Sequence, residues 1–217
     1  MATLPLFPLG TVLLPGARLP LQIFEPRYVA LLRDLLAGQE QRSPVFGVVA
    51  IREGYEVGDD GVVALHPVGC GALLTQAAAL ENERYFIVSE GTRRFRLDSV
   101  DAEAGTPYAT AEVTWLEEVE GDPATVSELA ARLRAALVSF ATTVGASELE
   151  LADDDRLLSY SVPQTVSLDV GDRQRLLECV DTESRLRLGL QLVRREKEFA
   201  VTLGAVANPP SSPPNLN

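Results

Sequence analysis

The sequence predicts an α+β protein in which a strand-rich part precedes a helical part. Up to about Leu116, apolar residues occur in short β-branched or aromatic runs bounded by Gly, Pro and Asp. After Gly121-Asp122-Pro123 they recur at helical spacing. Many short sequential strands with one early helix favour an antiparallel, partly closed barrel over a doubly wound parallel sheet. We expect a strand-rich subdomain over residues 1–118 and a helical subdomain over residues 119–203.

One helix is expected inside the strand-rich part, from Arg27 to Ala37. Pro26 suits its first turn, because the missing N–H would have no intrahelical partner there. Gly38 can end the helix in the left-handed conformation. The side chains expected to form the buried stripe of this helix are Tyr28, Leu31, Leu32, Leu35 and Leu36.

The strands of this part differ in how they are buried. The segment from Val45 to Ile51 is nearly all apolar, which is typical of a strand covered on both faces. Asp60-Gly61 indicates a hairpin turn. Between residues 108 and 115 apolar and polar residues alternate, so Ala109, Ala111, Val113 and Trp115 are expected to face the core together.

The helical part begins with a capping signal. Asp122 can cap the helix that Pro123 starts, and acidic residues at 153–155 precede a second helix that Pro163 interrupts. Further helices are expected over residues 172–180 and 183–199. Residues 185–192 alternate with period two, which favours a strand, but Leu and Arg are good helix formers and β-branched residues are scarce. The Pro/Ser-rich tail, residues 204–217, is expected to be disordered.

Composition limits the classes of protein. At 217 residues with 46% hydrophobic content, the chain can form a substantial core. No apolar run approaches the roughly twenty residues that span a bilayer, so we expect a cytoplasmic protein with no membrane partner. A net charge of −12 makes nucleic acid an unlikely partner. Cys70 and Cys179 are far apart and are expected to be buried, reduced thiols rather than metal ligands.

The side-chain inventory argues against an enzyme. His66 is the only histidine and Lys197 the only lysine, so a zinc-protease motif with two histidines is excluded. The sequence has neither a nucleophile elbow nor a phosphate-binding loop. His66 and Cys70 on one extended strand would stand roughly 13 Å apart, too far for a nucleophilic pair. Gly69-Cys70-Gly71 is interpreted as a strand with close backbone approach. We expect no catalytic residue, cofactor or metal.

Several short motifs follow one another in a fixed order between residues 5 and 97. They are Pro5-Leu6-Phe7-Pro8-Leu9-Gly10, Leu13-Leu14-Pro15-Gly16, Leu19 to Tyr28, Phe46-Gly47-Val48-Val49, Glu56-Val57-Gly58, Val68-Gly69-Cys70-Gly71-Ala72 and Glu90 to Leu97. This ordered set resembles the N-terminal, substrate-binding domain of Lon proteases. The resemblance implies a PUA-like pseudo-barrel followed by a helical bundle, here in a stand-alone form without the ATPase and peptidase domains.

The resemblance also implies a function. It favours a non-enzymatic bacterial module that binds unfolded or client polypeptides in protein quality control or as an adaptor, with a protease or chaperone as a further partner. A homodimer is an open possibility. The alternative is a small-molecule or RNA-binding sensor that uses the barrel and its Arg-rich strand.

Candidate binding residues come from two segments. The first contains Phe24, Glu25, Arg27 and Tyr28, although a structural role explains this segment better: Glu25 caps or faces the positive end of the helix, Tyr28 packs and Arg27 pairs with an acid. The second contains Arg94 and Arg96. If their neighbours Phe95 and Leu97 face the core, these two arginines share the solvent face of one strand with Asp98.

Overall fold

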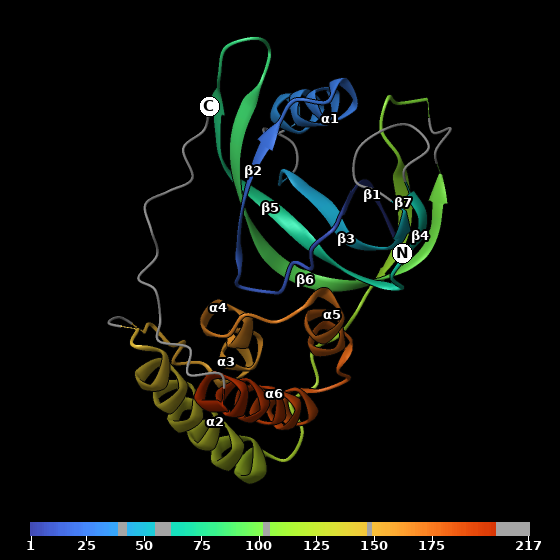
Figure 1. Ribbon diagram of the computed structural model, residues 1–217. Coiled ribbons are helices and arrows are strands. Elements are labelled where there is room, and N and C mark those ends of the chain that lie inside the picture. Colours follow the sequence, from blue (N-terminus) through green and yellow to red (C-terminus); the bar gives the residue numbers. More distant parts are fainter. Residues whose placement is uncertain (39–42, 55–61, 102–104, 147–148, 203–217) are drawn as a thin grey trace. The chain divides into compact units, whose positions relative to one another are not determined.

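The computed structural model describes residues 1–38, 43–54, 62–101, 105–146 and 149–202 (Figure 1). It contains two compact units. The first comprises Met1–Glu117 and Asp169–Glu178, and the second comprises Glu118–Leu168 and Cys179–Asn217. Residues 169–178 therefore lie with the first unit, whereas the sequence led us to place all of residues 119–203 in one helical subdomain. The expected hairpin turn at Asp60-Gly61 and the expected disorder of residues 204–217 lie outside the described residues.

A seven-stranded sheet forms most of the first unit (Figure 1). Its strands are β1 (Ala2–Leu9), β2 (Arg18–Ile23), β3 (Val45–Gly54), β4 (Val62–Leu65), β5 (Val68–Ala79), β6 (Tyr85–Asp101) and β7 (Thr110–Trp115). The order is β1-β7-β6-β5-β3-β4, and β1 also pairs with β3, so five strands close into a ring. The prediction of a sheet-rich, mainly antiparallel part is confirmed, but the β1–β3 pairing is parallel, from Leu6↔Gly47 to Leu9↔Ala50.

The core inside this ring is apolar and tightly packed. Phe95, Ala111 and Val113 are fully buried, as the alternation in β7 predicted for the last two. Gly69 supplies the close approach expected of its segment: a Cβ at this position would lie 2.4 Å from the Phe95 ring and 2.6 Å from the Val48 carbonyl oxygen. A side chain at position 69 would therefore displace the centre of the core.

Helix α1 (Pro26–Ala37) is the helix expected in this part of the chain. Pro26 occupies its first turn, as predicted. Tyr28 is buried, and its ring stacks on Phe7 with 3.9 Å between centroids. The expected left-handed end was wrong, because Gly38 has φ −87° and ψ −5° and closes the helix through hydrogen bonds from its own N–H. Leu36 was expected in the buried stripe but is exposed.

Helix α5 (Val170–Glu178) lies on the first unit through polar contacts. Arg94 of β6 is only 2% exposed, and its Nη1 donates to the carbonyl oxygen of Leu177 at 2.9 Å. Gln174 Nε2 donates to the carbonyl oxygen of Val68 at 3.0 Å. A cation near the last carbonyls of a helix is favourable, because these groups carry the negative end of the helix dipole. Arg94 therefore acts as an anchor for α5.

The second unit is helical. It contains α2 (Pro123–Val144), α3 (Asp155–Tyr160), α4 (Val162–Thr165) and α6 (Thr182–Thr202). Asp122 caps α2 by accepting from the Thr125 N–H at 2.9 Å, as predicted, and Asp154 caps α3 by accepting from the Leu157 N–H at 2.8 Å. The segment with period-two alternation is the helix α6, so the choice of helix over strand is confirmed. No helix among the described residues is long and apolar enough to cross a membrane.

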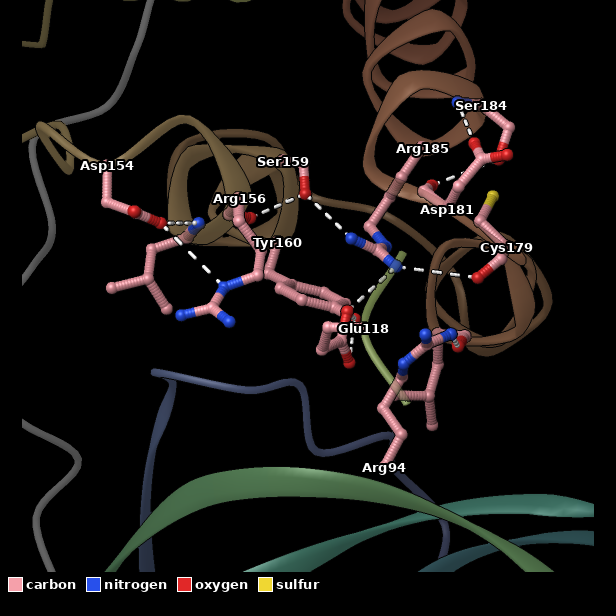
Figure 2. A network of polar contacts seen from close by, with 12 residues as sticks. Arg94, Glu118, Asp154, Arg156, Ser159, Tyr160, Cys179, Asp181, Ser184 and Arg185 are labelled. Atoms are coloured by element: carbon pink, nitrogen blue, oxygen red, sulfur yellow. Dashed lines mark hydrogen bonds and ion pairs between the residues drawn. The ribbon is translucent and has the colours of Figure 1, made fainter. Parts of the chain in front are cut away.

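A buried arginine joins several segments of this unit (Figure 2). The guanidinium of Arg185 is fully buried and donates from Nη1 to Ser159 Oγ at 3.0 Å and from Nη2 to the Cys179 carbonyl oxygen at 3.4 Å. Nη2 also lies 3.5 Å from Glu118 Oε2. The Arg185 Cζ lies 3.8 Å from the ring centroid of Tyr160, whose hydroxyl donates to Glu118 at 3.0 Å. The network compensates the burial of the Arg185 charge.

Candidate functional site

Three strands of the first unit present an exposed surface with apolar side chains at its centre. Cross-strand partners project to the same face of a sheet, and β6 pairs with β2 on one side and β5 on the other. Gln22 and Ala78 both pair with Phe86, and Pro20 and Gln76 both pair with Val88. We call this surface the outer face; it consists of Pro20, Gln22, Gln76, Ala78, Phe86 and Val88.

The outer face contains large apolar side chains that water reaches. Phe86 is 43% exposed, while its neighbour Ile87 points to the other side of the sheet and is 3% exposed. Phe24 follows β2 directly and is 55% exposed. Single exposed apolar residues are ordinary on a protein surface, but two phenylalanines at the end of one three-stranded segment form a candidate contact surface.

The edge of β2 lies next to the outer face. Among the described pairings, β2 pairs with β6 alone, and the Leu6–Leu9 stretch of β1 pairs with β3. A cavity of about 170 Å³ separates the two stretches. It is lined by Phe7, Pro8, Leu9, Thr11, Leu21, Gln22, Ile23, Phe24, Glu25 and Tyr28. An edge strand with a second side free can accept another extended chain through main-chain hydrogen bonds.

The first predicted segment borders this cavity. Phe24, Glu25 and Tyr28 line it, whereas Arg27 does not. Arg27 Nη2 forms an ion pair of 2.8 Å with Glu25, and the Arg27 Cζ lies 4.7 Å from the Tyr28 ring centroid. The Glu25 side chain makes no capping hydrogen bond to α1. Pairing of Arg27 with an acid and packing of Tyr28 were expected, and the capping alternative for Glu25 was wrong.

Helix α1 supports the tip of the β5–β6 hairpin. Arg33 lies 3.6 Å from Glu83 in the hairpin turn. A hydrogen bond and an electrostatic interaction with Tyr85, and then the negative charge of Glu83, raise the pKa of the Arg33 guanidinium above its ordinary value. Asn82 and Glu83 adopt φ of 59° and 55°, the left-handed backbone that a tight hairpin turn requires. These contacts join α1 to the hairpin turn that precedes Phe86.

A second, larger cavity lies beside the first residues of β1 and β3, before the positions at which these two strands pair. Its volume is about 540 Å³. It is lined by Thr3, Leu4, Pro5, Asp34, Leu35, Gly38, Ser43, Pro44 and Val45. Asp34 Oδ2 accepts a hydrogen bond of 2.6 Å from the hydroxyl of Tyr108. Burial, and then the hydrogen bond and charge of Asp34, raise the pKa of Tyr108 to about 12, so this phenol remains a donor at neutral pH.

The structure does not bring the predicted arginines together. Arg94 was expected on the solvent face beside Arg96 but is buried under α5, because the α5 carbonyl group offers a partner that sequence alone does not reveal. Arg96 is exposed and pairs with Asp98 at 2.8 Å. Arg93 lies over Trp115, with 5.2 Å from its Cζ to the ring centroid. The Arg-rich strand therefore does not present a continuous basic surface.

The other chemical candidates have separate partners. Cys70 is fully buried and contacts the Gly71 carbonyl oxygen at 3.5 Å, while His66 Nδ1 lies 4.0 Å from Glu178. Lys197 Nζ donates to Ser139 Oγ at 2.7 Å. Cys179 is half-buried rather than buried. Within the part of the chain that the structure describes, no group of three or more His, Cys, Asp or Glu side chains could hold a metal ion.

Sequence reasoning missed the outer face. Phe86 lies in the run Tyr85-Phe86-Ile87-Val88, which is apolar throughout and gives no sign of which side chains face water. The partners Gln22 and Gln76 are polar, and their positions opposite β6 follow only from the strand pairing. The register of the three strands is therefore the observation that identifies the site.

Comparisons with known proteins extend over most of the chain. Residues 3–195 match the family model of the ATP-dependent protease La (LON) substrate-binding domain. A Lon protease of Anaeromyxobacter dehalogenans is 27% identical over 206 residues, which are 91% of this chain and 24% of the relative. Lon protease 4 of Sorangium cellulosum is 36% identical over 154 residues, 70% of this chain and 18% of the relative. The chain thus spans about a quarter or less of the length of these curated relatives.

Solved structures agree with the sequence matches. A crystal structure titled as a Lon N-terminal domain protein from Xanthomonas campestris is 27% identical, covers 88% of this chain and 98% of its own, and superposes with a TM-score of 0.63. The N-terminal domain of a Mycobacterium avium complex Lon protease shares the fold, with a TM-score of 0.68 at 20% identity over 89% of this chain and 98% of its own. The chain belongs to the LON substrate-binding domain family.

Proposed function

We propose that this protein binds extended, apolar segments of unfolded polypeptides on the outer face and along the edge of β2. Membership of a substrate-binding domain family supports a polypeptide ligand. The location of the proposed site is supported by two exposed phenylalanines, Phe24 and Phe86. They lie next to the edge of β2, which pairs with β6 alone among the described strands. In this proposal the protein serves as a quality-control or adaptor module and performs no chemistry itself.

The two parts of the surface recognise different properties of an unfolded chain. An extended segment beside β2 can exchange main-chain hydrogen bonds whatever its side chains, which gives broad specificity. Its apolar side chains can then cover Phe86 and Phe24. In a folded protein the main-chain groups of the strands are already hydrogen-bonded and most apolar side chains are buried. It therefore presents few free main-chain groups or apolar side chains to this surface. The surface thus favours unfolded over native protein.

The ring of Phe86 supplies a measurable share of the affinity. Fully burying a phenylalanine is worth up to about 3 kcal/mol, and Phe86 has about half of its surface already covered. Covering the remainder stabilises the complex by about 1 kcal/mol, which corresponds to about fivefold in Kd. Phe24 is exposed to a similar extent and contributes a similar amount.

Fluorescence anisotropy with one labelled model protein, in a native and a permanently unfolded form, tests the proposal. We expect binding of the unfolded form only, with weak dependence on salt. Phe86→Ala and Phe24→Ala should each weaken binding about fivefold. Val138→Ala removes an apolar side chain with 52% exposure from α2 and should leave binding unchanged. Equal binding of both protein forms, or equal losses in all three variants, would contradict the proposal.

A further inference from the structure

We infer that the cavity of about 540 Å³ between the starts of β1 and β3 binds a lysine or arginine side chain of a bound polypeptide. We call it the Asp34 cavity. The inference rests on the proposed function and adds a preference for basic residues among the apolar segments that the protein binds. The volume of the Asp34 cavity lies within the range of ordinary ligand pockets, whereas the volume of the cavity beside β2 lies below this range.

The walls of the Asp34 cavity match the two ends of a basic side chain. Leu4, Leu35, Pro44 and Val45 provide apolar surface for a long aliphatic stem. Among the described residues that line the cavity, Asp34 carries the only charged side chain, and this charge is negative. Lysine and arginine place an aliphatic stem on apolar surface and keep the cationic head at a polar group, so their chemistry is complementary to both parts.

The Asp34 carboxylate is positioned and has no cationic partner in the described residues. The Tyr108 hydroxyl donates to Oδ2 at 2.6 Å, and among the described residues the other carboxylate oxygen accepts no hydrogen bond. The neighbouring Arg33 forms an ion pair with Glu83 of the hairpin turn and a hydrogen bond with Tyr85 at the start of β6. A carboxylate can accept about four hydrogen bonds, so Asp34 can bind an ammonium or guanidinium group without losing Tyr108.

The backbone around the cavity suits an extended ligand. The parallel pairing of β1 with β3 begins at Leu6↔Gly47, after the cavity-lining residues of both strands. Thr3, Leu4 and Pro5 pair with β7 on one side and border the cavity as well. The net charge of −12 adds long-range attraction for basic segments. Cavity shape, local charge and overall charge therefore favour the same class of side chain.

Two labelled peptides test this inference. They share one extended apolar sequence and differ at a single central position, which is lysine in one and glutamine in the other. With the wild-type protein at low salt, the lysine peptide should bind about threefold more tightly, the effect of one partly exposed ion pair. Raising the salt concentration should reduce this difference, since the screening length becomes shorter.

Two variants separate the cavity from the rest of the surface. Asp34→Asn removes the charge and keeps an oxygen that can accept from Tyr108, so it should abolish the preference for lysine over glutamine. Ser43→Phe fills the rim of the cavity and should have the same effect without altering Asp34. Glu128→Gln removes an exposed carboxylate from α2 and should preserve the preference.

The outcomes distinguish the two proposals. Equal affinity of the lysine and glutamine peptides for the wild-type protein would overturn the assignment of the Asp34 cavity and leave the proposed function intact. A preference that persists in both Asp34→Asn and Ser43→Phe would overturn it as well. Failure of both peptides and of unfolded protein to bind would overturn the proposed function and, with it, this inference.

Discussion

Replacing Arg185 by methionine should strongly destabilise the second unit. Methionine approximates the length of the arginine stem but removes the guanidinium, which is fully buried and contacts Ser159, Glu118 and the Cys179 carbonyl oxygen. Glu118, whose side chain is 20% exposed, would keep the Tyr160 hydroxyl as a partner but lose its cation. Removing one member of a buried ion pair costs about 3–5 kcal/mol, because the remaining charge is uncompensated.

The double variant tests whether the unpaired charge causes the loss. Adding Glu118→Gln to Arg185→Met removes the charge and retains a side-chain oxygen that can accept from Tyr160. The double variant should therefore be more stable than Arg185→Met alone, by about 1–2 kcal/mol. Urea unfolding followed by far-ultraviolet circular dichroism measures each variant, since the second unit is helical. A stable Arg185→Met, or additive losses in the double variant, would refute this explanation.

Two further predictions concern the first unit. Gly69→Ala should reduce the unfolding free energy by about 1–3 kcal/mol, because its Cβ would lie 2.4 Å from the Phe95 ring and 2.6 Å from the Val48 carbonyl oxygen; unchanged urea stability would contradict the packing described. The pKa of Tyr108 is raised to about 12, above its ordinary value of 10.0. The folding stability that this phenol contributes is therefore fully present below pH 10 and is lost as the pH rises toward 12. The wild type should lose more stability over this range than Tyr108→Phe, which lacks the hydroxyl; parallel pH profiles would show that burial and Asp34 do not raise this pKa.

Local signals in the sequence were sufficient for most of the helices. Asp122 and Pro123 mark the start of α2 because capping depends on residues within one turn. The period-two pattern in α6 was misleading by itself, since Leu186, Leu190 and Val193 are buried at helical spacing. Local propensity, together with the family resemblance, led to the correct choice of helix for this segment.

Features that depend on distant partners could not be predicted. Arg94 lies in an alternating strand and is expected to face water until α5, about 80 residues later, provides a carbonyl acceptor. The parallel pairing of β1 with β3 likewise follows from the closure of the ring, which no short pattern encodes. The candidate segment at residues 24–28 was found from its motif, whereas Phe86 emerged only from the register of three strands.

The position of α5 has a consequence for how the molecule can be divided and made. A fragment ending at Glu117 would contain β1 to β7 but would lack residues 169–178 of its own compact unit. Arg94 would lose its Leu177 acceptor and Val68 would lose Gln174. During synthesis, the first unit could acquire its full set of contacts only after residue 178 has left the ribosome. Fragments for binding studies should therefore retain α5. In the growing chain, the strands of the first unit leave the ribosome long before the helix that completes their contacts.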